Sequence, residues 1–370
     1  MIKVIADQNL YRLQEFLPNE VELTSYDPHQ GLPDTNGFDA LLIRTVSKLN
    51  HQTFPEIPES LRFVGTGSSG IDHVDTDYLK SNNIEFADAL GNNSRAVAEY
   101  VMTALLLWRE EKSKNLADFS CGIVGVGNAG SVVAEIFGDF GLKTVLYDPP
   151  RAEREPGFNS ASLDEVLNCD VITFHVPFSD AGKYPTKHWL NEEKMITRSF
   201  ELIINAARGG VIDEFAVSKA MDSGQVKDIV IDVWENEPDF DAEFANRAFI
   251  ATPHIAGYSE QSKLNASSMI CEKLCHFFGL KCPLTENLYQ VKEIKPAHIK
   301  YSLIDWLLRL HPIKEYDAVL RDLAQRQDKD ILFQKLRTDR PYRFEYSFLK
   351  LEEKFLKGFD DLKRLGVKRK

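Results

Sequence analysis

The sequence lacks the features that mark a membrane or a secreted protein. Its 370 residues contain no apolar run that approaches the length of a transmembrane helix. The N-terminus has neither the long apolar segment nor the small-residue cleavage site of a signal peptide, and it is typical of a first β-strand. We therefore expect a cytoplasmic protein that does not bind membranes.

Cysteine is scarce, and its spacing does not fit the common metal or disulfide motifs. There are five cysteines, an odd number, and none has the C-x-x-C spacing. Cys271 and Cys275 are four residues apart on an expected amphipathic helix, where core packing is favoured over metal binding or a disulfide. The sequence thus predicts no metal site, and its cysteines fit a reducing compartment.

Positive charge is in deficit over the whole chain but not at its end. The net charge of −12 argues against nucleic acid as a partner. Residues 285–370 hold 20 Lys and Arg against 14 Asp and Glu, a net +6, so residues 1–284 carry −18. A basic tail on an acidic body indicates docking on another subunit or on an anionic ligand, although a solvated helical surface would give the same count.

The order of apolar segments predicts an α/β protein. Short β-rich runs alternate with helix-like runs, and two long helices are expected at residues 94–112 and 259–279. Continuous apolar strands separated by helices are typical of parallel sheets covered on both faces. After Cys282 and Pro283 the pattern becomes mostly helical, basic and aromatic, which predicts a smaller third domain.

Two glycine-rich loops match G-x-G-x-x-G, at residues 65–70 and 125–130, and each follows an expected strand. Asp72 and Asp75 follow the first loop, where carboxylates would repel a pyrophosphate at a helix N-terminus. The second loop is followed by "SVVAE", with no carboxylate before Glu135. We therefore expect the dinucleotide at the second loop, with contacts from Gly125, Gly127, Asn128, Ala129 and Gly130.

An acidic residue at the end of the next expected strand indicates which dinucleotide binds. Asp148 lies 23 residues after Gly125 and is well placed to accept hydrogen bonds from the adenosine ribose hydroxyls. Arg151 is a competing partner for a 2′-phosphate, but the carboxylate should dominate. The sequence predicts NAD rather than NADP.

Three side chains of complementary chemistry follow successive expected strands of the same sheet. Arg208 lies in "INAARGGVID", Glu237 in "VWENEPDF" and His254 in "ATPHIAGY". Arginine offers a rigid fork of donors that matches a carboxylate. A histidine can take a hydroxyl proton as hydride leaves, and a nearby carboxylate would stabilise its protonated form. We expect these three residues to be catalytic.

The first glycine loop needs another role. The segment "GTGSSGIDHVD" offers backbone N–H groups and hydroxyls that suit a small oxygen-rich anion. Arg44 and Thr45 follow another expected strand and could contribute to the same substrate site. The alternative for Arg44 is a solvated loop residue.

In order and spacing, "GIVGVGNAG…YDPP", "INAARGGVID", "DVWENEP" and "TPHIAGY" resemble the D-isomer-specific 2-hydroxyacid dehydrogenases. The resemblance implies that Arg208 binds the substrate carboxylate and carbonyl, that His254 is the acid/base, and that Glu237 pairs with it. It also implies a Rossmann NAD-binding domain inserted into a flavodoxin-like substrate domain. We expect the substrate domain at residues 1–91 and 258–284, the NAD-binding domain at 92–257, and a C-terminal dimerisation domain at 285–370.

Within the family, "GSSGIDHVD", "FHVPFSDAGKYPTKHWL" and "IAGYS" resemble a branch with an additional C-terminal segment that forms dimers. That resemblance implies a homodimer and a small phosphorylated hydroxy acid as substrate. Arg208 would hold its carboxylate, and Arg44 with hydroxyls near Thr66 its phosphate; we also hypothesise that a partner subunit contributes Arg337, Arg340 or Arg343. The implied substrate contacts are Thr45, Thr66 and Tyr258. The implied NAD contacts are Asp148, His175, Ala206, Ala207, Asp232 and Gly257.

Two alternatives remain. One is another dehydrogenase of the same family, such as one acting on 3-phosphoglycerate, although its usual regulatory βαβ module does not resemble this helical, basic tail. The other is an NAD-sensing interaction protein, like the corepressors built on this fold.

Overall fold

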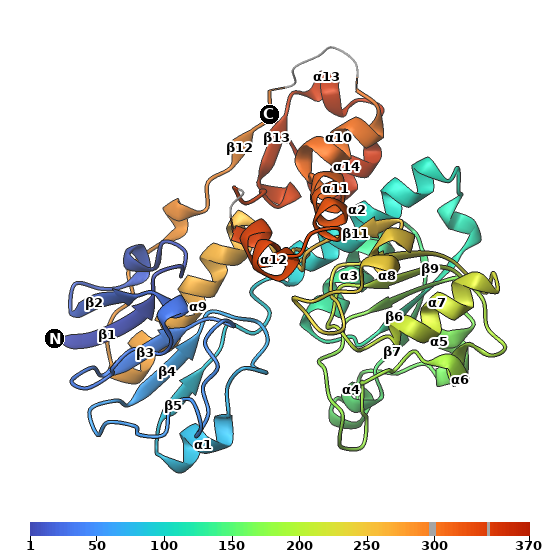
Figure 1. Cartoon of the computed structure of the whole chain (residues 1–370). Helices are drawn as coiled ribbons and strands as arrows, with labels where there is room; N and C mark the ends of the chain where they lie inside the picture. The colour runs from blue at the N-terminus through green and yellow to red at the C-terminus, as the bar shows by residue number, and fades with distance from the viewer. Residues whose placement is uncertain (296–300, 339–340) are drawn as a thin grey trace. The chain divides into compact units, whose positions relative to one another are not determined.

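A computed structural model describes residues 1–295, 301–338 and 341–370 (Figure 1). These residues form two compact units. The first comprises residues 1–93 and 260–290, and the second comprises residues 94–259 and 291–370. No helix within the described residues is long and apolar enough to cross a bilayer.

The first unit is built on a five-stranded parallel sheet with the order β2-β1-β3-β4-β5. This is the flavodoxin-like order, and it confirms the doubly wound architecture expected from the alternating pattern. Both faces of the sheet are covered, because residues of opposite parity on β1 enter two different cores: Val4 lies in one and Ile5 in the other. The strands are β1 (Ile2–Asp7), β2 (Val21–Tyr26), β3 (Ala40–Ile43), β4 (Phe63–Thr66) and β5 (Glu85–Ala87).

The long helix α9 (Glu260–Phe278) covers one face of this sheet. Its buried residues Leu264, Ile270 and Leu274 recur at helical spacing and pack in the core that includes Val4. The remaining helices are short: α1 (Thr76–Ser81) and the 3₁₀ turns η1 (Leu13–Phe16), η2 (Pro28–Gln30) and η4 (Glu286–Leu288).

The second unit contains a six-stranded parallel sheet with the order β11-β10-β9-β8-β6-β7. The order reverses between β6 and β8, which is where doubly wound sheets bind dinucleotides. Strands β6, β8, β9 and β11 are buried almost throughout, as expected for strands covered on both sides, whereas the edge strand β7 is only half-buried. The strands are β6 (Ser120–Val124), β7 (Lys143–Tyr147), β8 (Val171–Phe174), β9 (Phe200–Asn205), β10 (Val226–Ile231) and β11 (Ile250–Ala251).

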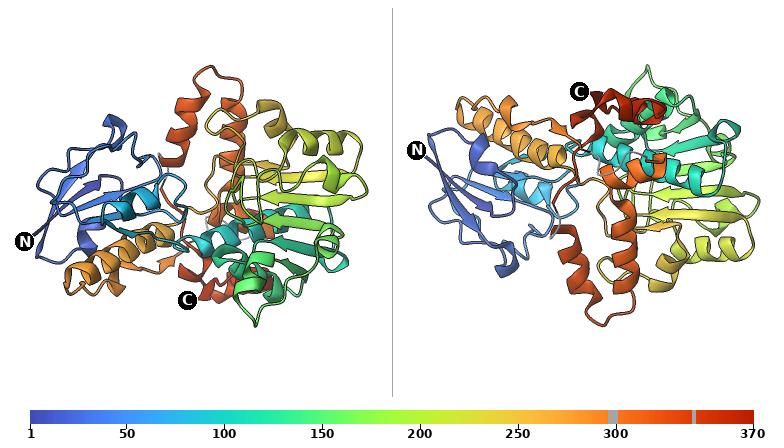
Figure 2. Two further views of the ribbon diagram at one scale, coloured as in Figure 1. Left: turned by 90° about the horizontal axis from the view of Figure 1, so that it is seen from below. Right: turned by 90° about the horizontal axis from the view of Figure 1, so that it is seen from above.

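Helix α2 (Ser94–Glu111) is buried on nearly all sides, because α3 (Asn128–Asp139) packs on it and C-terminal segments cover it from another side (Figure 2). This explains why its sequence is apolar on more than one face. The other helices of this part of the unit are η3 (Leu116–Asp118), α4 (Pro149–Arg154), α5 (Leu163–Leu167), α6 (Glu192–Met195), α7 (Glu214–Asp222) and α8 (Ala242–Arg247).

The C-terminal segment packs against α2 in the second unit. The Tyr346 hydroxyl shares a 2.7 Å hydrogen bond with Thr103, and Arg343 Nη1 donates to Glu99 Oε2 at 2.7 Å. The segment is mostly helical, as expected, but it also contains a three-stranded parallel sheet that the sequence pattern does not indicate. A separate third domain at 285–370 stays a prediction. The elements are β12 (Lys292–Glu293), α10 (Leu303–Leu310), α11 (Ile313–Leu323), α12 (Lys329–Thr338), η5 (Tyr346–Phe348), β13 (Leu349–Leu351), α13 (Glu353–Leu356), α14 (Asp360–Arg364) and β14 (Lys368–Arg369).

Candidate active site

The three residues expected to be catalytic follow adjacent strands of the six-stranded sheet. Arg208 comes three residues after β9, Glu237 lies in the loop after β10, and His254 follows β11. Strands β9, β10 and β11 are neighbours and parallel, so the three loops leave the sheet at the same edge. This is the edge where parallel α/β sheets place their ligands.

His254 and Glu237 are joined directly, by a 2.8 Å hydrogen bond between His254 Nδ1 and Glu237 Oε2. The other carboxylate oxygen of Glu237 accepts a hydrogen bond from the backbone N–H of Trp234 at 2.9 Å. Burial opposes ionisation of Glu237, but the interactions with His254, Trp234 and Arg337 lower the pKa of its carboxyl below the ordinary value. Glu237 is therefore a carboxylate at neutral pH, and it fixes the ring of His254.

The backbone of the His254 loop is fixed by Asp232, which is 1 % exposed. Its carboxylate accepts hydrogen bonds from the hydroxyl of Thr252 and from the backbone N–H groups of Ile255 and Ala256, at 2.6–2.8 Å. His254 itself has a left-handed backbone with φ 56°. A buried, fully hydrogen-bonded carboxylate can hold such an unusual conformation in place.

Arg208 owes its position to close packing between the β9 and β10 loops. A Cβ on the next residue, Gly209, would lie 1.8 Å from the carbonyl oxygen of Trp234, so only glycine fits there. The buried side chain of Asn205 donates to the carbonyl of Arg208 at 3.1 Å, and Arg208 Nη1 donates to Ala207 O at 2.7 Å. The glycines after Arg208 therefore let its loop approach the loop that carries Glu237.

The loop at residues 125–130 forms a turn that requires glycine. Gly125 has φ +85°, and a Cβ on Gly130 would lie 1.9 Å from the Gly125 carbonyl oxygen. Gly127, by contrast, has nothing within 4 Å of a Cβ position, which leaves open space at the start of α3. No side chain caps this helix and its first turn contains no acidic residue, so its N–H groups and dipole suit a pyrophosphate. Asn128 and Ala129 are the first two residues of this helix.

Asp148 follows β7 beside this turn. One carboxylate oxygen accepts from Val126 N at 2.8 Å and the other from Arg151 N at 2.9 Å. A carboxylate has about four acceptor positions, so Asp148 retains capacity for ribose hydroxyls. Arg151 is engaged locally, with hydrogen bonds to Glu155 and to the carbonyl of Val126. These contacts favour NAD over NADP.

His175 follows β8 and lines the same turn, since a Cβ on Gly125 would lie 2.8 Å from its backbone carbonyl carbon. Burial lowers the pKa of His175 to about 3, so its ring is neutral. Its Nε2 shares a hydrogen bond with Thr173, whereas Nδ1 is buried without a hydrogen-bond partner among the described residues. An orphaned buried ring nitrogen next to the glycine turn fits a cofactor contact. This physical reason is not visible in the sequence.

The other residues expected near NAD divide between the β9 and β11 loops. Ala206 and Ala207 are buried and directly precede Arg208, and Gly257 is half-buried after the His254 segment. The glycine turn, Asp148 and His175 thus fit a dinucleotide, and small residues border the catalytic loops.

The expected substrate contacts lie in both units. Arg44 follows β3 in the first unit, and its Nε donates to the buried carboxylate of Asp7 at 2.8 Å. Thr45 is exposed, and Thr66 is fully buried with its hydroxyl 2.9 Å from His73 Nε2. Tyr258 is half-buried in the second unit, close to the His254 loop.

Arg337 of helix α12 lies against Tyr258, in the loop that carries His254 in the same chain, and the sequence pattern does not indicate this contact. Its guanidinium carbon is 5.5 Å from the ring centroid of Tyr258, and the two side chains share a hydrogen bond. Burial opposes its charge, but Tyr258, Glu237 and Asp232 raise the pKa of Arg337 above its ordinary value. Arg340 lies outside the described residues, and Arg343 is held by Glu99.

These features together define a class of protein, a dehydrogenase that uses NAD. They are a glycine turn at a helix N-terminus, a carboxylate after the next strand, and a histidine–glutamate pair at the same sheet edge. The family model for the D-isomer specific 2-hydroxyacid dehydrogenase, NAD binding domain, matches residues 93–256. A solved D-lactate dehydrogenase from Aquifex aeolicus, complexed with NAD and lactic acid, shares the fold with a TM-score of 0.59 and 24% identity, covering 75% of this chain and 95% of that one.

Curated relatives are more similar in sequence. The erythronate-4-phosphate dehydrogenase of Bacteroides thetaiotaomicron is 35% identical over 350 residues, 93% of this chain and 97% of that protein. The enzyme of that name from Proteus mirabilis is 35% identical over 95% of this chain and 94% of its own length. The chain belongs to the erythronate-4-phosphate dehydrogenases, within the D-isomer specific 2-hydroxyacid dehydrogenase family. The resemblance, the enzyme class and the cofactor expected from the motifs are confirmed.

Proposed function

We propose that this protein oxidises 4-phospho-D-erythronate to 2-oxo-3-hydroxy-4-phosphobutanoate, with NAD as the oxidant, in the biosynthesis of pyridoxal 5'-phosphate. The names and the nearly full-length similarity of the curated relatives support the substrate. The observation that carries the reaction type is the 2.8 Å hydrogen bond between His254 and Glu237, at the sheet edge that also carries the glycine turn.

In this proposal His254 is the general base. Its Nδ1 is occupied by Glu237, so Nε2 is the ring nitrogen that takes the proton of the substrate's C2 hydroxyl. The carboxylate of Glu237 stabilises the imidazolium that forms. Arg208 binds the substrate carboxylate through its planar fork of donors and fixes the hydroxyl carbon relative to His254. Bound NAD supplies the acceptor for the hydride that leaves C2.

For the substrate phosphate we propose Arg44, the hydroxyls near Thr66, and Arg337 as binding groups, with Thr45, Thr66 and Tyr258 as substrate contacts. Arg337 of the same chain is proposed because its guanidinium lies over the ring of Tyr258, and an arginine from a partner subunit stays a separate hypothesis. Its Nε is buried and has no hydrogen-bond partner among the described residues, so a donor is left for an anion. Phe333, on the same helix, packs on Phe240 with ring centroids 5.8 Å apart and anchors the arginine.

The variant Arg337→Ala tests this role. We expect KM for 4-phosphoerythronate to rise at least tenfold and KM for unphosphorylated erythronate to stay within twofold. The matched control is Arg326→Ala, which removes an exposed arginine paired with Asp328 just before the same helix. Equal losses with both substrates would exclude phosphate binding by Arg337.

We also propose that the chain forms a homodimer through residues 285–370 and acts in the cytoplasm. The net +6 of this segment beside the −18 of the rest of the chain supports an intersubunit contact. Analytical ultracentrifugation should give twice the chain mass of 42.1 kDa. A species at the chain mass at micromolar concentration would contradict the proposal.

The substrate is tested by following reduced nicotinamide absorbance with 4-phosphoerythronate and with 3-phosphoglycerate. We expect kcat/KM to be at least a hundredfold higher for 4-phosphoerythronate. A preference for 3-phosphoglycerate would favour the other dehydrogenase. No hydride transfer with any hydroxy acid would favour the NAD-sensing interaction protein.

A further inference from the structure

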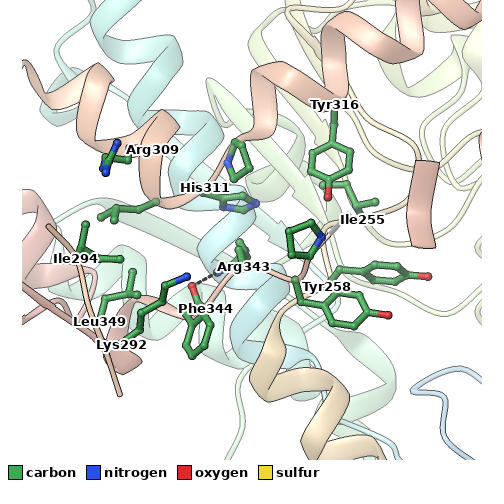
Figure 3. Close-up of a pocket in the computed structure, with 14 residues that line it drawn as sticks. Ile255, Tyr258, Lys292, Ile294, Arg309, His311, Tyr316, Arg343, Phe344 and Leu349 are labelled. Atoms are coloured by element: carbon green, nitrogen blue, oxygen red, sulfur yellow. Dashed lines mark hydrogen bonds between the residues drawn. The ribbon is translucent and has the colours of Figure 1, made fainter. Parts of the chain in front are cut away.

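A cavity in the C-terminal part of the second unit is lined by neither the glycine turn nor the side chains of His254 and Glu237. It has a volume of about 170 Å³ and is enclosed by segments far apart in the sequence: the loop after β11, strand β12, the junction of α10 and α11, and the segment before η5 (Figure 3). Of its lining residues, Tyr258 is a substrate contact in the proposed function, and the others have no role there.

The described residues that line the cavity include three cations and no Asp or Glu. The cations are Lys292, Arg309 and Arg343. Arg343 is neutralised by Glu99, whereas Lys292 and Arg309 are exposed. Glu293, the acidic neighbour of Lys292, is paired with Lys370 at 2.7 Å instead. The electrostatic field in the cavity is therefore positive, and an anion would lower its energy.

Two buried nitrogens in the cavity wall have no hydrogen-bond partner among the described residues. They are Nδ1 of His311, a residue 1 % exposed, and Nε of Arg343, whose side chain is 5 % exposed. Burial, and then the charge of Arg343, lower the pKa of His311 well below its ordinary value, so the ring is neutral. A buried polar nitrogen without a partner raises the free energy of the folded state, and a hydrogen-bonding ligand would remove that cost.

The rest of the wall is apolar or aromatic. Ile255, Ile294 and Leu310 contribute aliphatic surface, and Tyr258 and Phe344 contribute rings. Figure 3 shows His311 and Arg343 between the cationic side, with Arg309 and Lys292, and the side of Tyr258 and Tyr316. An engineered apolar cavity of about 150 Å³ holds benzene, so about 170 Å³ holds one six-membered ring.

We propose that this cavity binds a small organic anion, a single aromatic ring that carries a phosphate or carboxylate group, with the acid group at Arg309 and Lys292 and the ring between His311 and Tyr258. Because Ile255 and Tyr258 belong to the loop that carries His254, the ligand would touch the segment that holds the catalytic base. This gives the site a physical route to the dehydrogenase activity.

Phenyl phosphate is a suitable probe, and isothermal titration of the full-length protein in saturating NAD measures its binding. We expect saturable binding to the wild type and a Kd at least tenfold higher for the double variant Arg309→Ala/Lys292→Ala. Both side chains are exposed, so their removal should leave the thermal unfolding temperature unchanged. Inorganic phosphate, which has no ring, should bind at least tenfold more weakly than phenyl phosphate.

Two further variants separate this cavity from the candidate active site, which also receives anions. Arg44→Ala, which removes a group proposed for the substrate phosphate, should bind phenyl phosphate as the wild type does, and so should Arg326→Ala, which lies outside the cavity. Absence of saturable binding would overturn the proposal. So would binding that is lost in Arg44→Ala but kept in the double variant, or equal affinity for inorganic phosphate. None of these results depends on whether 4-phosphoerythronate is the substrate.

Discussion

Replacing Glu237 by glutamine tests the proposed role of the histidine–glutamate pair. The change keeps the shape of the side chain and removes the charge that lies 2.8 Å from His254 Nδ1. A hydrogen bond to a charged group contributes about 1.5–3 kcal/mol, and His254 gains its charge only as the hydroxyl proton is transferred. The side chains of His254 and Glu237 are 31 % and 21 % exposed, so solvent screens the interaction only in part. We therefore take this range as the energy lost in the variant. The expected loss in kcat is about 10- to 150-fold.

The assay is steady-state NAD reduction with 4-phosphoerythronate, together with the Kd for NAD. The matched control is Glu235→Gln. Glu235 lies two residues before Glu237 in the same loop, and its carboxylate makes a similar 2.7 Å contact with His188. We expect the control to retain kcat within twofold and both variants to bind NAD normally. If Glu237→Gln kept kcat within twofold of the wild type, the reasoning would be refuted.

Three other predictions concern the turn, the cofactor and the pH dependence. Gly130→Ala places a Cβ 1.9 Å from the Gly125 carbonyl oxygen, so the free energy of unfolding should fall by about 1–3 kcal/mol and the affinity for NAD should fall at least tenfold. The control Gly138→Ala, on the open side of α3, should lower neither stability nor NAD affinity. Asp148→Asn should raise the ratio of kcat/KM for NADP to that for NAD at least tenfold; an unchanged ratio would exclude Asp148 as the discriminating residue. Burial raises the pKa of Glu214 to about 8, so its stabilising neutral form is fully present below about pH 4.5 and lost as the pH rises through 8. At pH 9 the free energy of unfolding in urea should therefore be larger for Glu214→Gln than for the wild type, by on the order of 4 kcal/mol. At pH 4.5 the two proteins should be equally stable, and an equal difference at both pH values would contradict this.

The sheets and the catalytic loops were predictable from the sequence, because buried parallel strands are continuous apolar runs and because Arg208, Glu237 and His254 each follow one. The choice between the glycine loops was also predictable. The first is followed by Asp75, which caps α1 through Tyr78 N, whereas the second leads directly into the uncapped α3. Local charge therefore favours the second loop as the cofactor site, and that loop lies within the part of the chain that matches the NAD-binding family model.

The remainder depends on contacts between distant segments. Strands β12 and β14 contain two residues each, too few for an alternating pattern. The charge of the tail led to the hypothesis that an arginine of a partner subunit binds the substrate phosphate, and this stays a prediction. The contact of Arg337 with Tyr258 within the same chain depends instead on how helix α12 packs, with Phe333 on Phe240. Likewise, the orphaned nitrogen of His175 becomes visible only once Gly125 and β8 are side by side.

The central claim is that His254 accepts the substrate proton during hydride transfer. The most direct measurement is the kcat of His254→Asn with 4-phosphoerythronate and NAD, since asparagine tolerates the left-handed backbone with φ 56° at this position. We predict that kcat falls about 10²- to 10⁴-fold while the Kd for NAD stays within twofold of the wild type. A variant that turns over within tenfold of the wild-type rate, with NAD bound normally, would contradict the account.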